Sequence, residues 1–134
     1  MNEQENTQVV QQAYQYFKSG NIEGVLSLMA DDVDWRLPAV ENMPHSGQRK
    51  GLEQVAEFFA DVQDAKLFDP NDFIAQGDRV VALGHYIWQV KPTNRQYESD
   101  FVHIFTVRGG KITGFDEYFD TTPATIAYQK AQTA

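Results

Sequence analysis

Apolar side chains recur every three or four residues in the first half of the chain, and this spacing predicts helices. The first predicted helix has its apolar face on Val10, Ala13, Tyr14 and Phe17, and Gly20 is expected to end it. A second, short helix has its stripe on Ile22, Val25, Leu26 and Met29. A third has its apolar face on Leu52, Val55, Ala56, Phe59 and Val62.

A short strand is expected between the second and third helices. Val33, Trp35 and Leu37 alternate there with polar residues, and Pro38 ends the run. The preceding acidic pair at 31–32 is expected to terminate the second helix, and residues 39–50 are expected to form a loop.

From residue 65 onward the apolar spacing changes to two, which is typical of strands. Strands are predicted at 65–76, 79–91, 96–108 and 111–120, separated by short turn signals. Strands joined by short turns are antiparallel neighbours. Residues 121–134 are expected to form a short helix or a loose tail. Helices followed by a strand meander indicate an α+β fold.

Length and composition narrow the class of protein. A chain of 134 residues is typical of a single domain, expected here to span residues 1–134. It contains no cysteine, which excludes disulfides and thiolate chemistry and favours a cytoplasmic location. The net charge of −8 argues against nucleic-acid binding, and no apolar stretch is long enough to span a membrane.

Four stretches of sequence carry a family resemblance. They are residues 20–35, residues 47–59, residues 101–112 and residues 115–121. Through them the chain resembles the nuclear transport factor 2-like superfamily, and within it the SnoaL-like polyketide cyclase and ketosteroid isomerase branch. The resemblance implies a cystatin-like cone, in which three N-terminal helices pack on a curved antiparallel sheet around a pocket. It also implies a homodimer that pairs through the sheet.

The resemblance does not extend to the residues that define ketosteroid isomerases, which use an Asp base and an oxyanion hole of Tyr and protonated Asp. The position of the base is occupied by Leu37, which cannot accept a proton, so steroid isomerisation is not expected. The position of the protonated Asp falls on His103. The tyrosine position falls at or beside Ala13, which leaves Tyr14 one residue away.

Strand parity predicts which side chains line the pocket. If His103 points inward, every second residue of its strand does so too, and the match to the family turns Glu117 inward on the last strand. The predicted pocket residues are Tyr14, Phe17, Trp35, Leu37, Phe59, His85, Phe101, Phe105, Phe115 and Phe119. Sequence leaves open whether His85 or Tyr86 lies opposite Phe101. The outer face is expected to carry Tyr97, Tyr118 and either Tyr86 or Trp88.

His103 and Glu117 are the candidate catalytic pair. A carboxylate beside a histidine orients the ring, and the two can act as general base and acid on a small apolar carbonyl or epoxide substrate. Two alternatives remain open: a non-catalytic ligand-binding protein, and a protein-interaction module with a filled cone. His45, in a loop, is either a surface residue or part of a lid. No metal or cofactor is expected.

Overall fold

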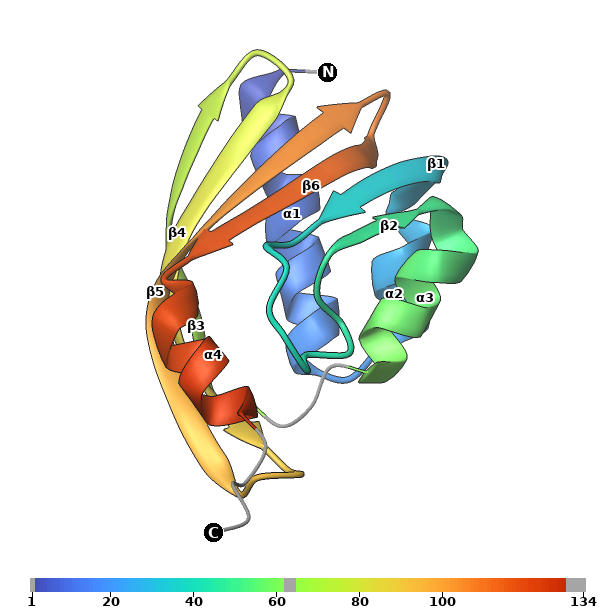
Figure 1. The fold of residues 1–134 in the computed structure, drawn as a ribbon. Coiled ribbons are helices and arrows are strands. Elements are labelled where there is room, and N and C mark those ends of the chain that lie inside the picture. The colour runs from blue at the N-terminus through green and yellow to red at the C-terminus, as the bar shows by residue number, and fades with distance from the viewer. Residues whose placement is uncertain (1, 62–64, 130–134) are drawn as a thin grey trace, which may run out of the picture.

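The computed structural model describes residues 2–61 and 65–129, which form helices packed on a curved six-stranded sheet (Figure 1). The helices are α1 (Glu3–Lys18), α2 (Ile22–Ser27), α3 (Gly51–Asp61) and α4 (Thr121–Tyr128). The strands are β1 (Met29–Arg36), β2 (Gln48–Lys50), β3 (Ala65–Gln76), β4 (Arg79–Val90), β5 (Arg95–Arg108) and β6 (Lys111–Phe119). The α+β class and three N-terminal helices are as expected, but Met29, expected on the second helix, begins β1. Val62, expected in the third helix, lies outside the described residues.

The sheet has the order β2-β1-β6-β5-β4-β3, and β3 to β6 form the antiparallel meander that was expected. The first strand departs from the expectation, because β1 runs parallel to β6. The long connection through α3 and the meander allows this, since parallel neighbours need a long crossover. Residues 48–50, expected in a loop, form an edge strand against β1. The acidic pair at 31–32 lies within β1 and does not end a helix.

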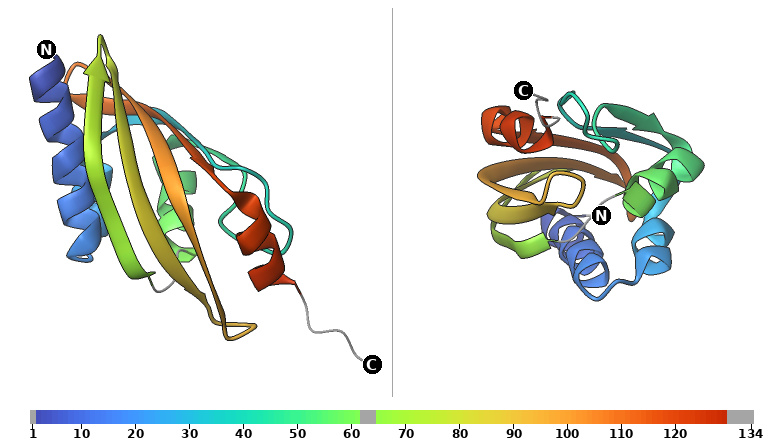
Figure 2. Two further views of the ribbon diagram at one scale, coloured as in Figure 1. Left: turned by 90° about the vertical axis from the view of Figure 1, so that its left-hand side faces the viewer. Right: turned by 60° about the horizontal axis from the view of Figure 1, so that its bottom comes forward.

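The helices α1, α2 and α3 lie over one side of the curved sheet, and α4 covers its far end (Figures 1 and 2). Helix α1 begins at a capping box, in which the Asn2 side chain accepts from the Glu5 backbone N–H and the Glu5 side chain accepts from that of Asn2. It ends before Gly20, whose φ of 78° suits glycine. None of the helices in the described residues is long and apolar enough to cross a membrane.

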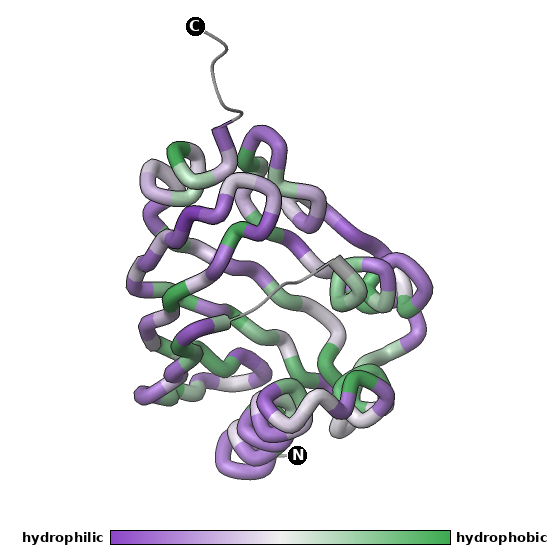
Figure 3. Tube along the Cα trace, turned by 90° about the horizontal axis from the view of Figure 1, so that it is seen from below, coloured by the Kyte–Doolittle hydropathy of each residue, from purple (hydrophilic) through white to green (hydrophobic). Residues whose placement is uncertain are grey.

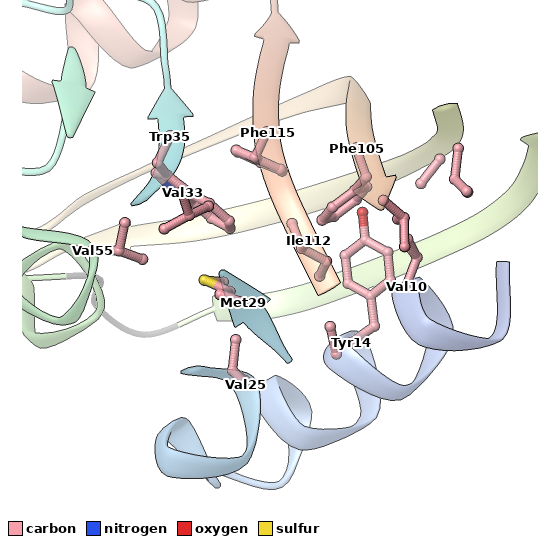
Figure 4. Packing of buried hydrophobic residues seen from close by; sticks show 14 of the residues in the cluster. Val10, Tyr14, Val25, Met29, Val33, Trp35, Val55, Phe105, Ile112 and Phe115 are labelled. Atoms are coloured by element: carbon pink, nitrogen blue, oxygen red, sulfur yellow. The ribbon is translucent and has the colours of Figure 1, made fainter. Parts of the chain in front are cut away.

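Alternation along the strands separates a buried face from a more open one. Figure 3 shows hydrophobic and hydrophilic positions following one another along the sheet. On β5, Phe101, His103, Phe105 and Val107 are buried, while the residues between them are partly exposed. The inner face packs against Val10, Tyr14 and other apolar residues of the N-terminal half (Figure 4). This face forms the core on which the site is built.

Helix α4 packs against β5 beside the β4–β5 hairpin. Its buried residues are Ala124, Ala127 and Tyr128. The hairpin holds its C-terminal end: Arg95 donates to the carbonyl of Ile126 at 2.8 Å, and Thr93 donates to that of Ala127 at 2.7 Å. These bonds satisfy carbonyl groups that a helix end leaves without partners. Of the short helix or loose tail expected after residue 120, residues 121–128 form the helix, and residues 130–134 lie outside the described part.

Candidate functional site

A row of three polar side chains crosses the inner face of the sheet. His103 on β5 and Glu117 on β6 are directly paired across the two strands, and the Nε2 of His103 lies 2.6 Å from the Oε2 of Glu117. On the other side of the imidazole, the Tyr14 hydroxyl from α1 lies 2.6 Å from Nδ1. Both ring nitrogens of His103 therefore have a partner.

The surroundings of Tyr14 indicate where the protons lie. Burial raises the pKa of the Tyr14 hydroxyl well above its usual value, and the charge of Glu117 adds to this effect. Tyr14 therefore stays protonated, and its hydroxyl is available to donate to Nδ1 of His103. The imidazole is then left with its own proton on Nε2, which it donates to the Glu117 carboxylate. Hydrogen bonds are thus donated from the Tyr14 hydroxyl to the His103 imidazole, and from the imidazole to the Glu117 carboxylate.

Aromatic rings enclose the row and fix the imidazole. Phe101 stacks on His103 with ring centroids 4.2 Å apart, and Phe115 lies edge-on at 4.8 Å. The His103 side chain is 5% exposed and that of Glu117 10%. A carboxylate at this depth is costly unless it is paired, and the histidine N–H provides the pairing.

Next to the row lies a pocket of about 70 Å³ that is partly open to the surface. Ten of the twelve predicted site residues line it: Tyr14, Phe17, Trp35, Leu37, Phe59, His103, Phe105, Phe115, Glu117 and Phe119. They come from α1, α3, β5, β6 and the β1 region, which meet only in the folded chain. The predicted side chains are thus brought together around one space.

Two predicted pocket residues lie elsewhere. His85 faces the outer side of the sheet, where its ring nitrogens lie 2.9 Å from Asp100 and 2.8 Å from Glu98. Phe101 points inward but is not among the lining residues, because it is covered by Tyr86 and His103, on which it stacks. Across the strands Phe101 faces Gly84, so neither of the two residues considered for that position occupies it.

Several lining residues were not predicted. Tyr86, which sequence left open as the inward alternative to His85, points inward, and so do Trp88 and Tyr97. The outer face was expected to carry Tyr97 and either Tyr86 or Trp88, and this expectation is wrong for all of them. The inward position of Tyr97 could have been predicted, because Tyr97 and His103 are an even number of residues apart on β5 and so point to the same face. His45 also lines the pocket from the 39–47 loop, with its ring 5.8 Å from that of Phe58. The further unpredicted lining residues are Ala13, Val25, Met29, Met43, Phe58 and Phe68.

Comparison with known proteins identifies the family. The family model for the SnoaL-like domain matches residues 10–115. The chain belongs to the SnoaL-like domain family. The fold is the cystatin-like cone expected from the resemblance, with nuclear transport factor 2-like proteins among its structural neighbours. No curated protein matches the chain.

Three solved structures resemble this SnoaL-like domain over nearly their whole lengths. An NTF2-like protein from Burkholderia xenovorans LB400 is 32% identical with a TM-score of 0.87, covering 96% of this chain and 99% of its own. TerC, co-crystallised with polyporic acid, is 32% identical with a TM-score of 0.81, and the match covers 92% of this chain and 98% of TerC. A cystatin-like protein from Xanthomonas campestris, 18% identical with a TM-score of 0.82 over 97% and 100%, shares the fold alone.

In this SnoaL-like domain, Leu37 stands at the position that the family resemblance assigns to the base of ketosteroid isomerases. Leu37 lines the pocket and can contribute only apolar surface. The ionisable side chains that line the pocket are Tyr14, His103 and Glu117 of the row, together with His45, Tyr86 and Tyr97. Within residues 2–61 and 65–129, no group of three or more histidine, cysteine or acidic side chains is arranged to hold a metal ion.

Two further tyrosines of the SnoaL-like domain lie near the carboxylate. The pKa values of Tyr86 and Tyr97 are both raised, first by burial, and the charge of Glu117 acts in the same direction on each. Both hydroxyls line the pocket as protonated groups at neutral pH. The polar end of the pocket thus combines one carboxylate with several hydroxyl donors.

Proposed function

We propose that the protein binds a small, largely apolar ring compound in the cone and catalyses proton transfer on it by general acid–base chemistry. The observation that carries the proposal is the buried Tyr14–His103–Glu117 row at the wall of an aromatic pocket. Buried ionisable groups in a pocket favour a functional role over a purely structural one.

Glu117 is the proposed base. Its Oε2 accepts the histidine N–H, and this bond does not require the other carboxylate oxygen. That second oxygen can remove a proton from a carbon next to a ligand carbonyl. The enolate oxygen formed in this step needs a hydrogen-bond donor, and the Tyr86 and Tyr97 hydroxyls, which burial keeps protonated, line the same pocket. The proton then returns from Glu117 to a different atom, or to the same carbon.

His103 holds the carboxylate in place and connects it to Tyr14. With Tyr14 donating to Nδ1 and Nε2–H donating to Glu117, the imidazole cannot rotate without losing both bonds. The stacked ring of Phe101 opposes the same rotation. A base held within hydrogen-bond reach of its target gains most from such positioning.

The similarity to TerC supports a ligand with aromatic rings and oxygen substituents. TerC has been co-crystallised with polyporic acid, a hydroxylated quinone that carries phenyl rings, and it is 32% identical to this chain. The pocket here is also lined mainly by rings, which offer offset-stacked and edge-on contacts to a flat ligand. Its volume of about 70 Å³ is below the roughly 150 Å³ of an apolar cavity that holds benzene, so a bound ring must also use the open side.

The proposal can be tested without knowledge of the natural substrate. We would incubate the protein with 1-indanone in D₂O and follow deuterium incorporation at the carbon next to the carbonyl by NMR. The wild-type chain should accelerate exchange about 100-fold or more over buffer, the usual range for a positioned base. Glu117→Gln and His103→Phe should lose this acceleration.

Asp116→Asn provides the matched control, because Asp116 is the next residue on β6 and lies on the other face of the sheet. This variant should retain the wild-type rate. If Glu117→Gln exchanges the probe as fast as wild type, general base catalysis by this row is refuted. If 1-indanone binds in the pocket and the wild-type protein does not accelerate its exchange, proton abstraction by this row is refuted and non-catalytic binding is the better account.

A further inference from the structure

The indole N–H of Trp35 is a buried donor that no group in the described part of the chain satisfies. Trp35 is 5% exposed, and its Nε1 makes no hydrogen bond to any group in residues 2–61 or 65–129. Buried polar groups in folded proteins are nearly always paired, so an exception requires an explanation. Trp35 is also one of the residues that line the pocket.

The indole is fixed by its neighbours. Trp35 stacks on Phe115 with ring centroids 3.8 Å apart and an interplanar angle of 16°. The rings of Phe58 and Phe59 also pack against the indole, with ring centroids 5.5 Å and 5.6 Å from that of Trp35. Figure 4 shows Trp35 and Phe115 side by side on the adjacent strands β1 and β6. The N–H therefore cannot turn to reach a distant protein acceptor.

The ring contacts of Trp35 offer a bridging water no partner. A buried water needs two to four polar groups to hold it. The rings in contact with Trp35 belong to phenylalanines, which offer no hydrogen-bonding atoms. An acceptor oxygen carried by an apolar ring is better suited, because the ring makes the apolar contacts and the oxygen takes the N–H.

The position of Trp35 relative to the proton-transfer row sets the shape of such a ligand. Trp35 is paired with Phe115 on β6, and Glu117 follows two residues later on the same face of that strand. Two residues along a strand span about 7 Å. Trp35 covers one face of Phe115, so a ligand that contacts both Trp35 and the Glu117–His103 pair must extend past Phe115 along β6.

We infer that Trp35 binds a second oxygen of the ligand, and that the ligand is a ring compound with oxygen substituents at opposite ends, such as a quinone or a hydroxylated aromatic ketone. This inference rests on the proposed function, since it uses the same pocket. Because Nε1 is fully covered in this structure, the arriving oxygen must displace a neighbouring pocket side chain. In this arrangement Trp35 selects the ligand and takes no part in proton transfer.

The test compares 1,4-naphthoquinone, which has an oxygen at each end of one ring, with naphthalene, which has none. The quinone is usable because the chain contains no cysteine to react with it. Indole N–H signals of the ¹⁵N-labelled wild-type protein are recorded with each probe. The chain has two tryptophans, and Trp88→Phe assigns the Trp35 signal. The quinone should move that signal downfield, and naphthalene should not.

Affinity gives the second readout. Trp35→Phe should weaken quinone binding about tenfold relative to naphthalene binding, which corresponds to one lost hydrogen bond. Phe59→Leu is the control, because it should weaken both probes alike. If both probes perturb His103 but the Trp35 signal shows no downfield shift with the quinone, the inference is wrong while the proposed pocket stands. If neither probe perturbs any pocket signal, both the inference and the proposed ligand class are wrong.

Discussion

Gly84 and Phe101 are directly paired across β4 and β5, and the Phe101 ring occupies the space that a Cβ atom on residue 84 would need. The same ring stacks on His103. A residue without a side chain on β4 thus allows the wall behind the imidazole to form. Gly84 has no positive φ, so space and not backbone conformation accounts for glycine at this position.

Gly84→Ala is therefore expected to destabilise the protein. The added methyl group would meet the Phe101 ring and the backbone carbonyl of Asp69, and the backbone atom cannot move aside easily. Overpacking of this kind costs about 1–3 kcal/mol, to be measured by urea unfolding. Gly114→Ala on β6 is the matched control, since its Cβ would make ordinary contacts with Thr106. Equal stability of the two variants would contradict this account.

The buried tyrosines predict alkaline unfolding. Burial raises the pKa values of Tyr14, Tyr86 and Tyr97, and it raises that of Tyr128 to about 12, from a usual value of 10.0. Above pH 10 the unfolded chain releases these protons while the folded chain keeps them. The free energy of unfolding must therefore fall as the pH rises past 10.

This fall can be measured by urea unfolding at a series of pH values from 8 to 12. Phenolate absorbance of the buried rings should appear together with the loss of circular dichroism, because these groups ionise only on unfolding. Tyr97→Phe should make the fall in stability less steep. Ionisation of all the tyrosines near pH 10 in a chain that remains folded would contradict the prediction.

His85 should titrate above its usual value of 6.5. Its pKa is raised by hydrogen bonds, first to Asp100 and then to Glu98, on the outer face of the sheet. Because the folded-state pKa is the higher one, the stabilising effect is fully present below pH 6.5 and is lost as the pH rises through the folded-state value. An NMR titration of the imidazole signals should show the raised value, and Asp100→Asn should lower it. Glu23→Gln, on a distant helix, should leave it unchanged.

The homodimer expected from the family resemblance stays a prediction. The outer face carries the partly exposed apolar side chains of Val81, Leu83, Val102 and Ile104, and Tyr118 is 57% exposed. Apolar side chains gathered on one face are typical of an interface. Light scattering at micromolar concentration should give twice the chain mass of 15.3 kDa. Leu83→Glu should give the monomer, whereas Ile126→Glu on α4 should not.

The apolar spacing by itself predicted most of the fold. Period-two alternation from residue 65 onward gave the four strands of the meander, and helical spacing gave the three N-terminal helices. The sidedness of β5 and β6 also followed from parity, because neighbouring residues of a strand must point to opposite faces. Once His103 was placed inside, Phe105 had to follow it.

Pairings between distant segments could not be obtained in this way. The parallel contact of β1 with β6 and the short edge strand β2 depend on where residues far apart in sequence meet. Across the hairpin at residues 91–94, the register decided that Tyr86 points inward and His85 outward. A shift of one residue would exchange them, and no local pattern fixes that shift.

The sequence therefore determined which side chains could share a face, since parity and helical spacing are properties of the chain itself. Tertiary structure alone decided that Tyr14 of α1 reaches His103, that His45 enters the pocket from its loop, and that the Trp35 indole N–H has no hydrogen-bond partner among residues 2–61 and 65–129. These relations depend on distances between elements. Such distances are set by the packing of the whole core and not by any single segment.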